Sequence, residues 1–409
     1  KQCHMNTISA SHEKKVVRRL ITNGKLIQID KILEDGYIII ENDKITAIGT
    51  GHPSSDDIDE IIDADQQYIS PGFIDLHTHG AGGADFMDGT VDAYLTVANT
   101  HARYGTTALL PTTLTCPDEE LFHTFEIYRQ AKKQNTKGAK FLGIHLEGPY
   151  FAYSQRGAQD PANLKAPTPE HYTSILNATD DIIRWSIAPE LDGALYLGKL
   201  LKEKQIIPSV GHTDAICEEV MEAHKAGYSL MTHLYSGMQT VTRRNALRYA
   251  GAVEAAFLLE DMDVEIIADG IHLPKSLLQL IHKFKGADRI ALVTDSMRGA
   301  GMPEGVYKLG SLKEGQTVMV EEGVAKLLDR SAFAGSVATA DRLVQTMVQL
   351  AEVSLTDAVK MMTATPARIL HMENRIGSLE VGKTADILLF DNQIRISRTI
   401  INGQTVYQA

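Results

Sequence analysis

Six side chains that could bind a metal ion occur at or just after short apolar runs of this sequence. They are His77, His79, Glu147, His212, His233 and Asp295. Imidazole nitrogens and carboxylate oxygens are the ligands that catalytic zinc and related divalent ions use. In a barrel of parallel strands, side chains at the carboxyl ends of the strands meet at one mouth, although they lie far apart in sequence. The pattern therefore predicts a metal-dependent hydrolase.

Each of these residues taken alone has a simpler interpretation. A single histidine such as His212 or His233 beside an apolar run is more often a hydrogen-bonded structural residue. The pair His77 and His79 is more specific, because alternate residues of a strand point to the same side. Their joint placement favours a metal site over the alternative, a degenerate barrel that keeps these residues for structural reasons.

The elements that must position these residues are short strands alternating with helical patterns over residues 71–376. The helical spacing of apolar residues in 215–226 is one example. Eight strand candidates occur at 70–77, 106–111, 140–146, 182–189, 205–210, 229–232, 264–268 and 289–294. The metal-ligand candidates stand at the ends of the first, third, fifth, sixth and eighth of them. This arrangement predicts a (β/α)8 barrel of the TIM type.

The two ends of the chain have a different texture, rich in short strands and tight turns. In residues 16–70 we expect strands separated by turns, with one turn at Asn23-Gly24. Residues 377–409 repeat this pattern, with a turn at Asn402-Gly403. We therefore expect the two ends to form one small β-sandwich domain beside the barrel.

Composition narrows the classes of partner and the compartment. The 409 residues carry a formal net charge of −12, which argues against nucleic acid and favours small molecules. The three cysteines Cys3, Cys116 and Cys217 are odd in number and widely spaced, so we expect a reducing compartment without a disulfide framework. The first ten residues lack a signal-peptide core and suggest an irregular start, and no run reaches the roughly 18 apolar residues of a membrane span. We expect a cytoplasmic protein with no membrane partner.

Along nearly its whole length, the chain resembles the N-acetylglucosamine-6-phosphate deacetylase family of the amidohydrolase superfamily. The matching segments are PGFIDLHTHG at 71–80, HLEGP at 145–149, GHTD at 211–214, THLY at 232–235, ADGIH at 268–272, LVTD at 292–295 and AGS at 334–336. The resemblance implies hydrolysis of the N-acetyl amide of an amino-sugar phosphate in amino-sugar metabolism. It also implies a divalent ion, with Zn2+ preferred and Fe2+ or another metal as alternatives.

The resemblance also implies a role for each metal-ligand candidate. Glu147, His212 and His233 would bind the ion common to the family. His77, His79 and Asp295 could complete a second position bridged by Glu147. Family members that use one ion lack the first histidine pair, and this chain retains it, so one or two ions both remain open. From its residue type, Asp295 suits a proton shuttle that accepts the proton of water and returns it to the leaving amine.

Five further residues correspond to substrate contacts of the family. They are His272, Arg244, Ser236, Gly237 and Gln159. His272 would lie beside the sugar phosphate, and the bidentate donors of Arg244 suit the phosphate itself. In the family this arginine reaches into the neighbouring subunit, which makes a homodimer the expected assembly. Simpler interpretations are a buried turn histidine for His272 and a solvated loop arginine for Arg244.

Three of these positions depart from the family. Ser236 and Gly237 stand where the family usually has Asn and Ala, and Gln159 stands where other members carry His. An amide can donate a hydrogen bond to a sugar hydroxyl or carbonyl, but it cannot act as an acid. An amidohydrolase for another N-acyl amino sugar or a cyclic amide therefore remains an alternative. A non-enzymatic metal-binding barrel is a further one, disfavoured by the retained Asp295 and by Gly335-Ser336.

Overall fold

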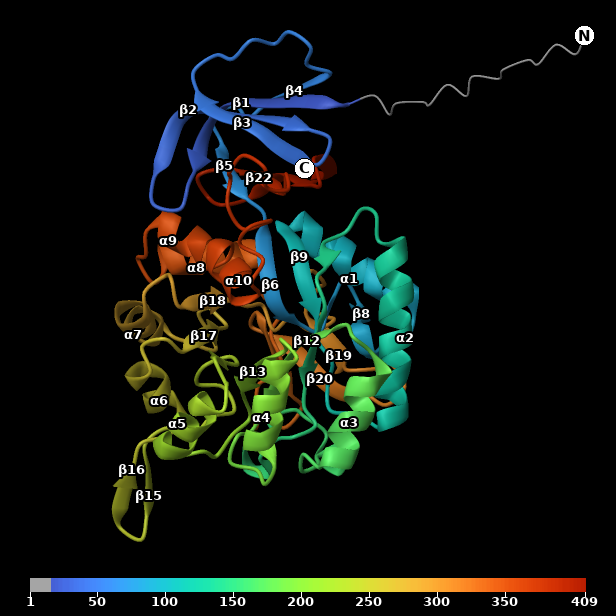
Figure 1. Cartoon of the computed structure of the whole chain (residues 1–409), viewed down its shortest axis with the longest axis vertical. Helices are drawn as coiled ribbons and strands as arrows, with labels where there is room; N and C mark the ends of the chain where they lie inside the picture. Colours follow the sequence, from blue (N-terminus) through green and yellow to red (C-terminus); the bar gives the residue numbers. More distant parts are fainter. Residues whose placement is uncertain (1–15) are drawn as a thin grey trace, which may run out of the picture.

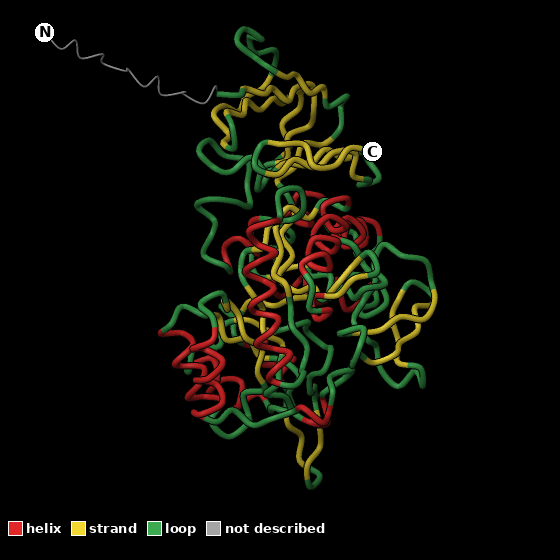
Figure 2. The backbone as a smooth tube through the Cα atoms, turned by 90° about the vertical axis from the view of Figure 1, so that its right-hand side faces the viewer, coloured by secondary structure: helices red, strands yellow, loops and turns green. Residues whose placement is uncertain are grey.

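The computed structural model describes residues 16–409 and has two parts (Figure 1). A sheet that holds both ends of the described chain lies against one end of a larger α/β body. The body is built from parallel strands surrounded by helices, which Figure 2 shows in yellow and red. The described chain therefore has a mixed α/β architecture.

The sheet at the chain ends follows the order β24-β23-β22-β5-β1-β2-β3, with β4 paired to β1. Its strands are β1 (Arg18–Ile27), β2 (Ile32–Glu41), β3 (Lys44–Thr50), β4 (Glu60–Asp63), β5 (Tyr68–Pro71), β22 (Ile387–Phe390), β23 (Ile396–Ile401) and β24 (Gln404–Gln408). The two ends join where β22 pairs antiparallel with β5. Buried isoleucines from both ends, such as Ile38 and Ile400, share one apolar cluster. The expected association of the ends is therefore present, as one continuous sheet.

One predicted turn in this region is wrong. Asn23-Gly24 lies inside β1, where the register with β2 shifts at a bulge. Asn23 adopts a φ of 60°, and a Cβ on Gly24 would lie 2.6 Å from the side chain of Ile69. A left-handed residue followed by glycine fits a bulge as well as a hairpin turn, and packing on β5 selects the bulge.

The parallel strands of the body form two sheets. The first has the order β10-β9-β6, and its strands are β6 (Phe73–Thr78), β9 (Thr106–Pro111) and β10 (Lys140–Phe141). The second has the order β11-β12-β13-β14-β17-β18, and its strands are β11 (Ile144–Glu147), β12 (Ile182–Ile187), β13 (Ile207–Val210), β14 (Leu230–Met231), β17 (Asp263–Ile266) and β18 (Ile290–Leu292). Single parallel bridges, Thr112 with His145 and Thr78 with Ser296, connect the two sheets.

All eight strand candidates contain strand structure. The first divides into β5 and β6, which belong to different sheets, and the third divides into β10 and β11. Gly143 separates the latter two with a φ of 154°, close against the side chain of Ile183. The predicted strand boundaries therefore differ from the observed ones mainly where one apolar run passes from one sheet to the next.

Helices follow most of these strands and cover the body. They are α1 (Val91–Arg103), α2 (Asp118–Gln134), α3 (Pro169–Ala178), α4 (Ala194–Glu203), α5 (Cys217–Lys225), α6 (Ala252–Leu258), α7 (Lys275–Lys285), α8 (Ala340–Gln349), α9 (Leu355–Lys360) and α10 (Ala364–Ile369). Helix α5 lies within the predicted 215–226 segment and buries Cys217, Val220 and Ala223 on one face. Among the helices of residues 16–409, none combines the length and the apolar character needed to cross a membrane.

Three small antiparallel sheets also belong to the body. A hairpin of β15 (Thr242–Arg244) and β16 (Leu247–Tyr249) projects from the side opposite the eight-stranded sheet (Figures 1 and 2). A three-stranded sheet of β19 (Gly305–Leu309), β20 (Gln316–Glu321) and β21 (Val324–Leu327) follows β18. Two-residue strands β7 (Gly80–Ala81) and β8 (Ala84–Asp85) pair after β6.

Cys116 and Cys217 are free thiols, whereas Cys3 and the expected irregular start lie outside the described residues.

Candidate metal centre

The structure brings all six metal-ligand candidates together at the carboxyl ends of the parallel strands. His77 lies in β6 and His79 directly follows it, while Glu147 is the last residue of β11. His212, His233 and Asp295 follow β13, β14 and β18 by two or three residues. Each of these last three has a φ between 28° and 46°, a region that residues other than glycine rarely adopt. Such strain is typical of functional sites.

The Glu147 carboxylate stands at the centre of this group. Its Oε1 lies 3.1 Å from Nε2 of both His212 and His233, and 3.5 Å from Nε2 of His77. Its Oε2 lies 3.2 Å from Nε2 of His79. One carboxylate therefore faces the imidazoles of four histidines.

Asp295 closes the other side of the centre. Its Oδ1 lies 3.3 Å from His77 Nε2 and 3.1 Å from His79 Nε2, and these two nitrogens are 3.3 Å apart. Ligand atoms lie within 4.8 Å of one another in two groups, His77–Glu147–His233 and His77–His79–Asp295. His77 takes part in both, whereas the sequence prediction grouped Glu147 and His233 with His212. Imidazole nitrogens that face one another and two carboxylates across a shared space fit a divalent cation.

Backbone carbonyls orient three of the histidines. Nδ1–H of His212 donates to the Gln155 carbonyl at 2.8 Å, and Nδ1–H of His233 donates to the Ser236 carbonyl at 3.1 Å. His79 makes the same type of contact to the Thr112 carbonyl at 3.3 Å. A proton fixed on Nδ1 leaves the lone pair of Nε2 directed at the centre, as metal-ligating histidines require.

The centre is buried, and its charges control one another. Burial pulls the pKa of the Glu147 carboxyl up, but the charge of His77 and hydrogen bonds from His212 and His233 hold that pKa well below its usual range. Burial pulls the pKa of His77 down, but the carboxylates of Asp295 and Glu147 raise it to about 9. A cation at this centre would compete with protons for the same ligand atoms, which makes metal binding pH-dependent.

A cavity of about 320 Å³ opens above the centre. Of the site residues predicted from the sequence, all but His77 and Arg244 line it. His77 is fully buried beneath the floor. Apolar side chains such as Leu114, Ile267 and Phe333 supply part of the wall. The cavity is a concave, mostly preformed site of the kind that takes a small ligand.

Two predicted substrate residues have well-defined contacts in the cavity. Nδ1 of His272 lies 2.7 Å from the Asp269 carboxylate, and its ring packs on Phe333 with centroids 4.3 Å apart. Gln159 donates from Nε2 to Glu147 Oε2 at 2.8 Å and accepts at Oε1 from the Thr115 N–H at 2.9 Å. Gln159 thus contacts the central carboxylate directly, which the sequence did not indicate.

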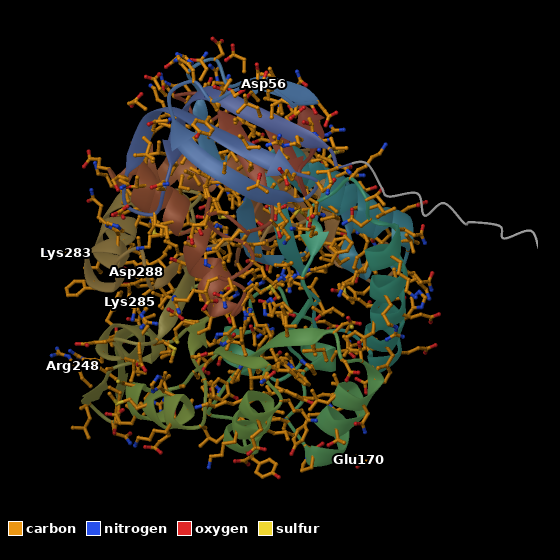
Figure 3. The ribbon with its side chains drawn as sticks, turned by 45° about the horizontal axis from the view of Figure 1, so that its top comes forward. Asp56, Glu170, Arg248, Lys283, Lys285 and Asp288 are labelled. Carbon is orange, nitrogen blue, oxygen red and sulfur yellow. The ribbon has the colours of Figure 1, made fainter. Side chains whose placement is uncertain are left out.

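The loop after β14 lines the cavity, whereas the hairpin that follows it does not. Ser236 and Gly237 line the cavity, and Gly237 has a φ of 59° with its Cα against the ring of His212. Arg244 lies on the exposed hairpin, where its Nη2 donates to the Asp214 carbonyl at 3.4 Å and its guanidinium lies 5.7 Å from the Tyr249 ring centroid. Arg248, in the same hairpin, points away from the body (Figure 3). Within one chain, Arg244 is therefore not part of the cavity.

Sequence reasoning missed three buried polar residues beneath the centre. Arg184 in β12 and Glu265 in β17 form an ion pair with no exposed side-chain surface. His145, next to Leu146 and Glu147 in β11, contacts Ser186 Oγ at 2.7 Å and Thr112 Oγ1 at 3.2 Å. One signal in the sequence pointed to Arg184 and Glu265. Each is a charged residue inside an apolar strand run, and such residues are almost never buried unless they are paired.

Comparisons with known proteins agree with this geometry. The model of the Amidohydrolase family matches residues 68–406. The N-acetylglucosamine-6-phosphate deacetylase of Bacillus subtilis (strain 168) is 32% identical over 95% of this chain and 97% of its own length. An N-acetylgalactosamine-6-phosphate deacetylase of Escherichia coli O157:H7 is 31% identical over 84% of this chain and 89% of its own length.

A solved structure is also similar to this chain. It is a mutant N-acetyl-D-glucosamine-6-phosphate deacetylase from Mycobacterium smegmatis in complex with N-acetyl-D-glucosamine-6-phosphate. The match has a TM-score of 0.87 and 29% identity, and it covers 96% of this chain and 100% of the other.

Proposed function

The chain belongs to the amidohydrolase family, and we propose from this premise that it hydrolyses the N-acetyl amide of N-acetylglucosamine 6-phosphate. The products are glucosamine 6-phosphate and acetate, so the reaction is a step of amino-sugar metabolism. The observation that carries the proposal is the cavity in which Glu147, His212, His233 and Asp295 converge beside His272.

The same residues support a metal-dependent mechanism. Glu147, His212 and His233 would hold one divalent ion, and His77 and His79 with Asp295 and Glu147 would hold a second one where two are bound. Zn2+ is the preferred ion because it takes mixed imidazole and carboxylate ligands, which Fe2+ also accepts. When bound, such an ion supplies a water with a pKa lowered to about 7 and a positive charge for the carbonyl oxygen.

The protein's own groups move the protons and orient the substrate. Asp295 accepts the proton of the attacking water through its carboxylate and returns it to the amide nitrogen as the bond to the acetyl carbon breaks. His272 is held through Nδ1 by Asp269, so Nε2 is the atom that faces the substrate. Gln159 keeps the Glu147 carboxylate in place from the cavity wall.

Phosphate recognition involves a second copy of the chain. The hairpin that carries Arg244 is exposed, and Leu247 and Val241 beside it are exposed apolar residues. An exposed hairpin of arginines and apolar side chains suits an interface between subunits better than open solvent. We infer a homodimer in which Arg244 of one subunit binds the sugar phosphate in the site of the other.

The architecture that supports this site extends the observed sheets. We propose that residues 71–376 form one (β/α)8 barrel and that 16–70 with 377–409 form a sandwich-like domain. The bridges from Thr112 to His145 and from Thr78 to Ser296 support closure of the barrel. Deletion of residues 377–409 should expose Ile38 and Ile40 and cause aggregation. A soluble, active truncated chain would contradict the two-part organisation.

A product assay tests the function. The purified protein, loaded with Zn2+, should release acetate and free amine from N-acetylglucosamine 6-phosphate. The unphosphorylated sugar, assayed beside it, should react far more slowly, because the phosphate carries close to two negative charges that Arg244 can bind. Equal turnover of both sugars would reject the phosphate-specific proposal.

A second candidate substrate is N-acetylgalactosamine 6-phosphate. Ser236, Gly237 and Gln159 differ from the residues that the deacetylase family usually has, and all three line the cavity. A similar chain from Escherichia coli O157:H7 is a deacetylase of that sugar phosphate. Comparing kcat/KM for the two epimers decides between them, and a preference for the galacto sugar would replace the first proposal.

A further inference from the structure

Arg184 and Glu265 form a charged pair directly beneath the metal centre, and the mechanism above does not use it. Nη1 of Arg184 donates to Oε1 of Glu265, and neither side chain is exposed. Burying two charges costs several kcal/mol per ion before pairing, so such a pair is weak support for a purely stabilising role. Its other contacts indicate a more specific role.

Arg184 connects strands that carry the ligands. Its Nη1 also donates to the carbonyl of Leu76 at 3.0 Å, and its Nη2 donates to Thr232 Oγ1 at 3.1 Å. These residues directly precede two of the ligand histidines. Its Nε donates to Ser209 Oγ at 3.0 Å. The guanidinium therefore fixes Glu265 and the strand ends on both sides of it.

Glu265 in turn faces both ion positions. Its Oε2 lies 3.5 Å from Nδ1 of His77 and accepts from the backbone N–H of His233 at 3.3 Å. Nε2 of the same His77 ring points at Glu147 and Asp295. A carboxylate behind one ring nitrogen and a metal before the other is the arrangement that orients a ligating histidine and raises its basicity.

Backbone carbonyls contact Nδ1 of His79, His212 and His233. Among the described residues, no carbonyl contacts Nδ1 of His77. Its ring packs edge-on against His145 with centroids 4.6 Å apart, and His145 is bonded instead to Ser186 and Thr112. Among residues 16–409, Nδ1 of His77 has no hydrogen-bond partner, and Glu265 Oε2 is the carboxylate oxygen that faces it, at 3.5 Å. Glu265 is therefore the residue placed to orient the ring of His77.

We propose that Glu265, held by Arg184, is a positioning residue that fixes His77 as a ligand of a second divalent ion with His79 and Asp295. The inference rests on the metal dependence proposed above, and it deepens that proposal by naming what sets the second position. It requires two ions per subunit in the native chain, and the affinity for the second ion must depend on Glu265.

The test is a zinc titration of the full chain. Wild-type protein, freed of metal by a chelator, should bind two equivalents of Zn2+ by equilibrium dialysis and elemental analysis. Glu265→Gln should bind the second equivalent about 10- to 100-fold more weakly, the usual effect of removing such an orienting partner. The matched control is Asp263→Asn at the opposite end of β17, where the carboxylate pairs with Arg368 at 2.6 Å. This control should bind both equivalents as the wild type does.

A double-mutant cycle separates positioning from general stability. His77→Ala should lose the second equivalent. Adding Glu265→Gln to it should change the remaining Zn2+ affinity less than about threefold, because Glu265 orients the second position through His77 and the new amide oxygen can still accept from the His233 N–H. If Glu265→Gln does not fold, Arg184→Met with Glu265→Gln removes both buried charges, a change that buried pairs often tolerate. That double variant should also lose the second equivalent.

Two results would overturn the inference. One is a wild-type chain that binds a single equivalent at saturating Zn2+, and the other is a Glu265→Gln or Arg184→Met/Glu265→Gln variant with wild-type affinity for two. Neither readout depends on catalysis. A protein that binds two ions in this Glu265-dependent manner but does not deacetylate the sugar phosphate would contradict the proposed function alone.

Discussion

The metal centre and the β15–β16 hairpin differ in what holds their residues in place. The six metal-ligand candidates are between 0% and 8% exposed and come from five strands of the parallel sheets. Arg244 lies on an exposed hairpin whose neighbour Leu247 is 64% exposed, and its hydrogen bond to Asp214 is 3.4 Å long. The centre is organised within one chain, whereas the hairpin has few contacts of its own.

This difference separates the residues proposed for the reaction from the residue proposed for substrate recognition. Strand ends and buried hydrogen bonds hold the six metal-ligand candidates in place, so one chain alone contains the groups proposed for the reaction. Residues of a hairpin with few contacts can be substituted without disturbing the metal centre. Such a hairpin acquires a fixed position only against another surface. Variants in the centre should therefore affect metal content and kcat, and variants in the hairpin should affect KM and specificity.

The largest effect is expected from removing a ligand of the centre. His233→Ala and His212→Ala each delete an imidazole that faces Glu147 at 3.1 Å, so bound Zn2+ should be lost and hydrolysis should fall to background. Elemental analysis of the purified variants measures the first effect, and acetate release measures the second. Full metal occupancy in both variants would contradict the assignment of these histidines as ligands.

A smaller but still large effect is expected at the proton shuttle. Asp295→Asn keeps the size of the side chain but removes its proton acceptor, so kcat should fall by about 10²- to 10⁴-fold. At least the ion held by Glu147, His212 and His233 should remain. Retention of wild-type kcat would exclude Asp295 as the acid–base group and would assign it to metal binding alone.

In the hairpin, Arg244→Ala should act on substrate binding. A hydrogen bond to a charged group contributes about 1.5–3 kcal/mol, so KM for the phosphorylated sugar should rise about 10- to 100-fold with little change in metal content. KM for the unphosphorylated sugar should not change. Arg248→Ala, on the paired strand of the same exposed hairpin, is the matched control. Equal effects of the two substitutions would argue against a specific phosphate contact.

Mixed dimers test whether Arg244 acts across subunits. An Arg244→Ala subunit paired with an Asp295→Asn subunit has one site with both residues intact. At substrate concentrations well below KM, random mixing should restore about a quarter of wild-type activity, because half of the dimers are mixed and each has one complete site. No recovery on mixing would show that Arg244 serves its own subunit.

The sequence was sufficient to predict that the six metal-ligand candidates lie together, because these residues are tied to strand ends. A histidine or carboxylate that follows an apolar run has its position set by the parallel sheet, so the spacing of runs predicted that His77 and Asp295 would meet. Parts set by tertiary packing were not predicted. The bulge at Asn23 depends on Ile69, and the contact between Gln159 and Glu147 joins a loop to a strand end.

Other missed features lack a local signature. The sheet of β19, β20 and β21 follows the last ligand, where no chemical motif drew attention to its strands. Arg184 and Glu265 interrupt apolar runs, but which charge pairs with which depends on the tertiary packing that brings these side chains of β12 and β17 together. Arg244 was expected near the cavity, and one chain alone leaves it outside.

Gly237 links the two regions and should be intolerant of the residue that the family usually has. A Cβ at this position would lie 2.9 Å from His212 Nδ1 and 3.0 Å from the Gln155 carbonyl, at a φ of 59°. Gly237→Ala should therefore displace His212 and weaken Zn2+ binding by about tenfold, the lower range for disturbing a partner of a ligand. Dialysis against a chelator of known affinity measures this. Gly157→Ala, another cavity glycine with positive φ and no close contact, controls for backbone strain.

Ser236→Asn should have the smallest effect and should act on specificity alone. Ser236 lines the cavity, and its backbone carbonyl accepts from His233, so a change of its side chain leaves the histidine contact intact. An added amide can donate one neutral hydrogen bond to the sugar phosphate, which contributes about 0.5–1.5 kcal/mol, or a two- to tenfold gain in kcat/KM. Comparing the gluco and galacto 6-phosphates with this variant shows whether Ser236 relaxes the choice between them. A change in Zn2+ content or an equal gain for the unphosphorylated sugar would show instead that this loop acts through the metal centre, and the division between the two regions would fail.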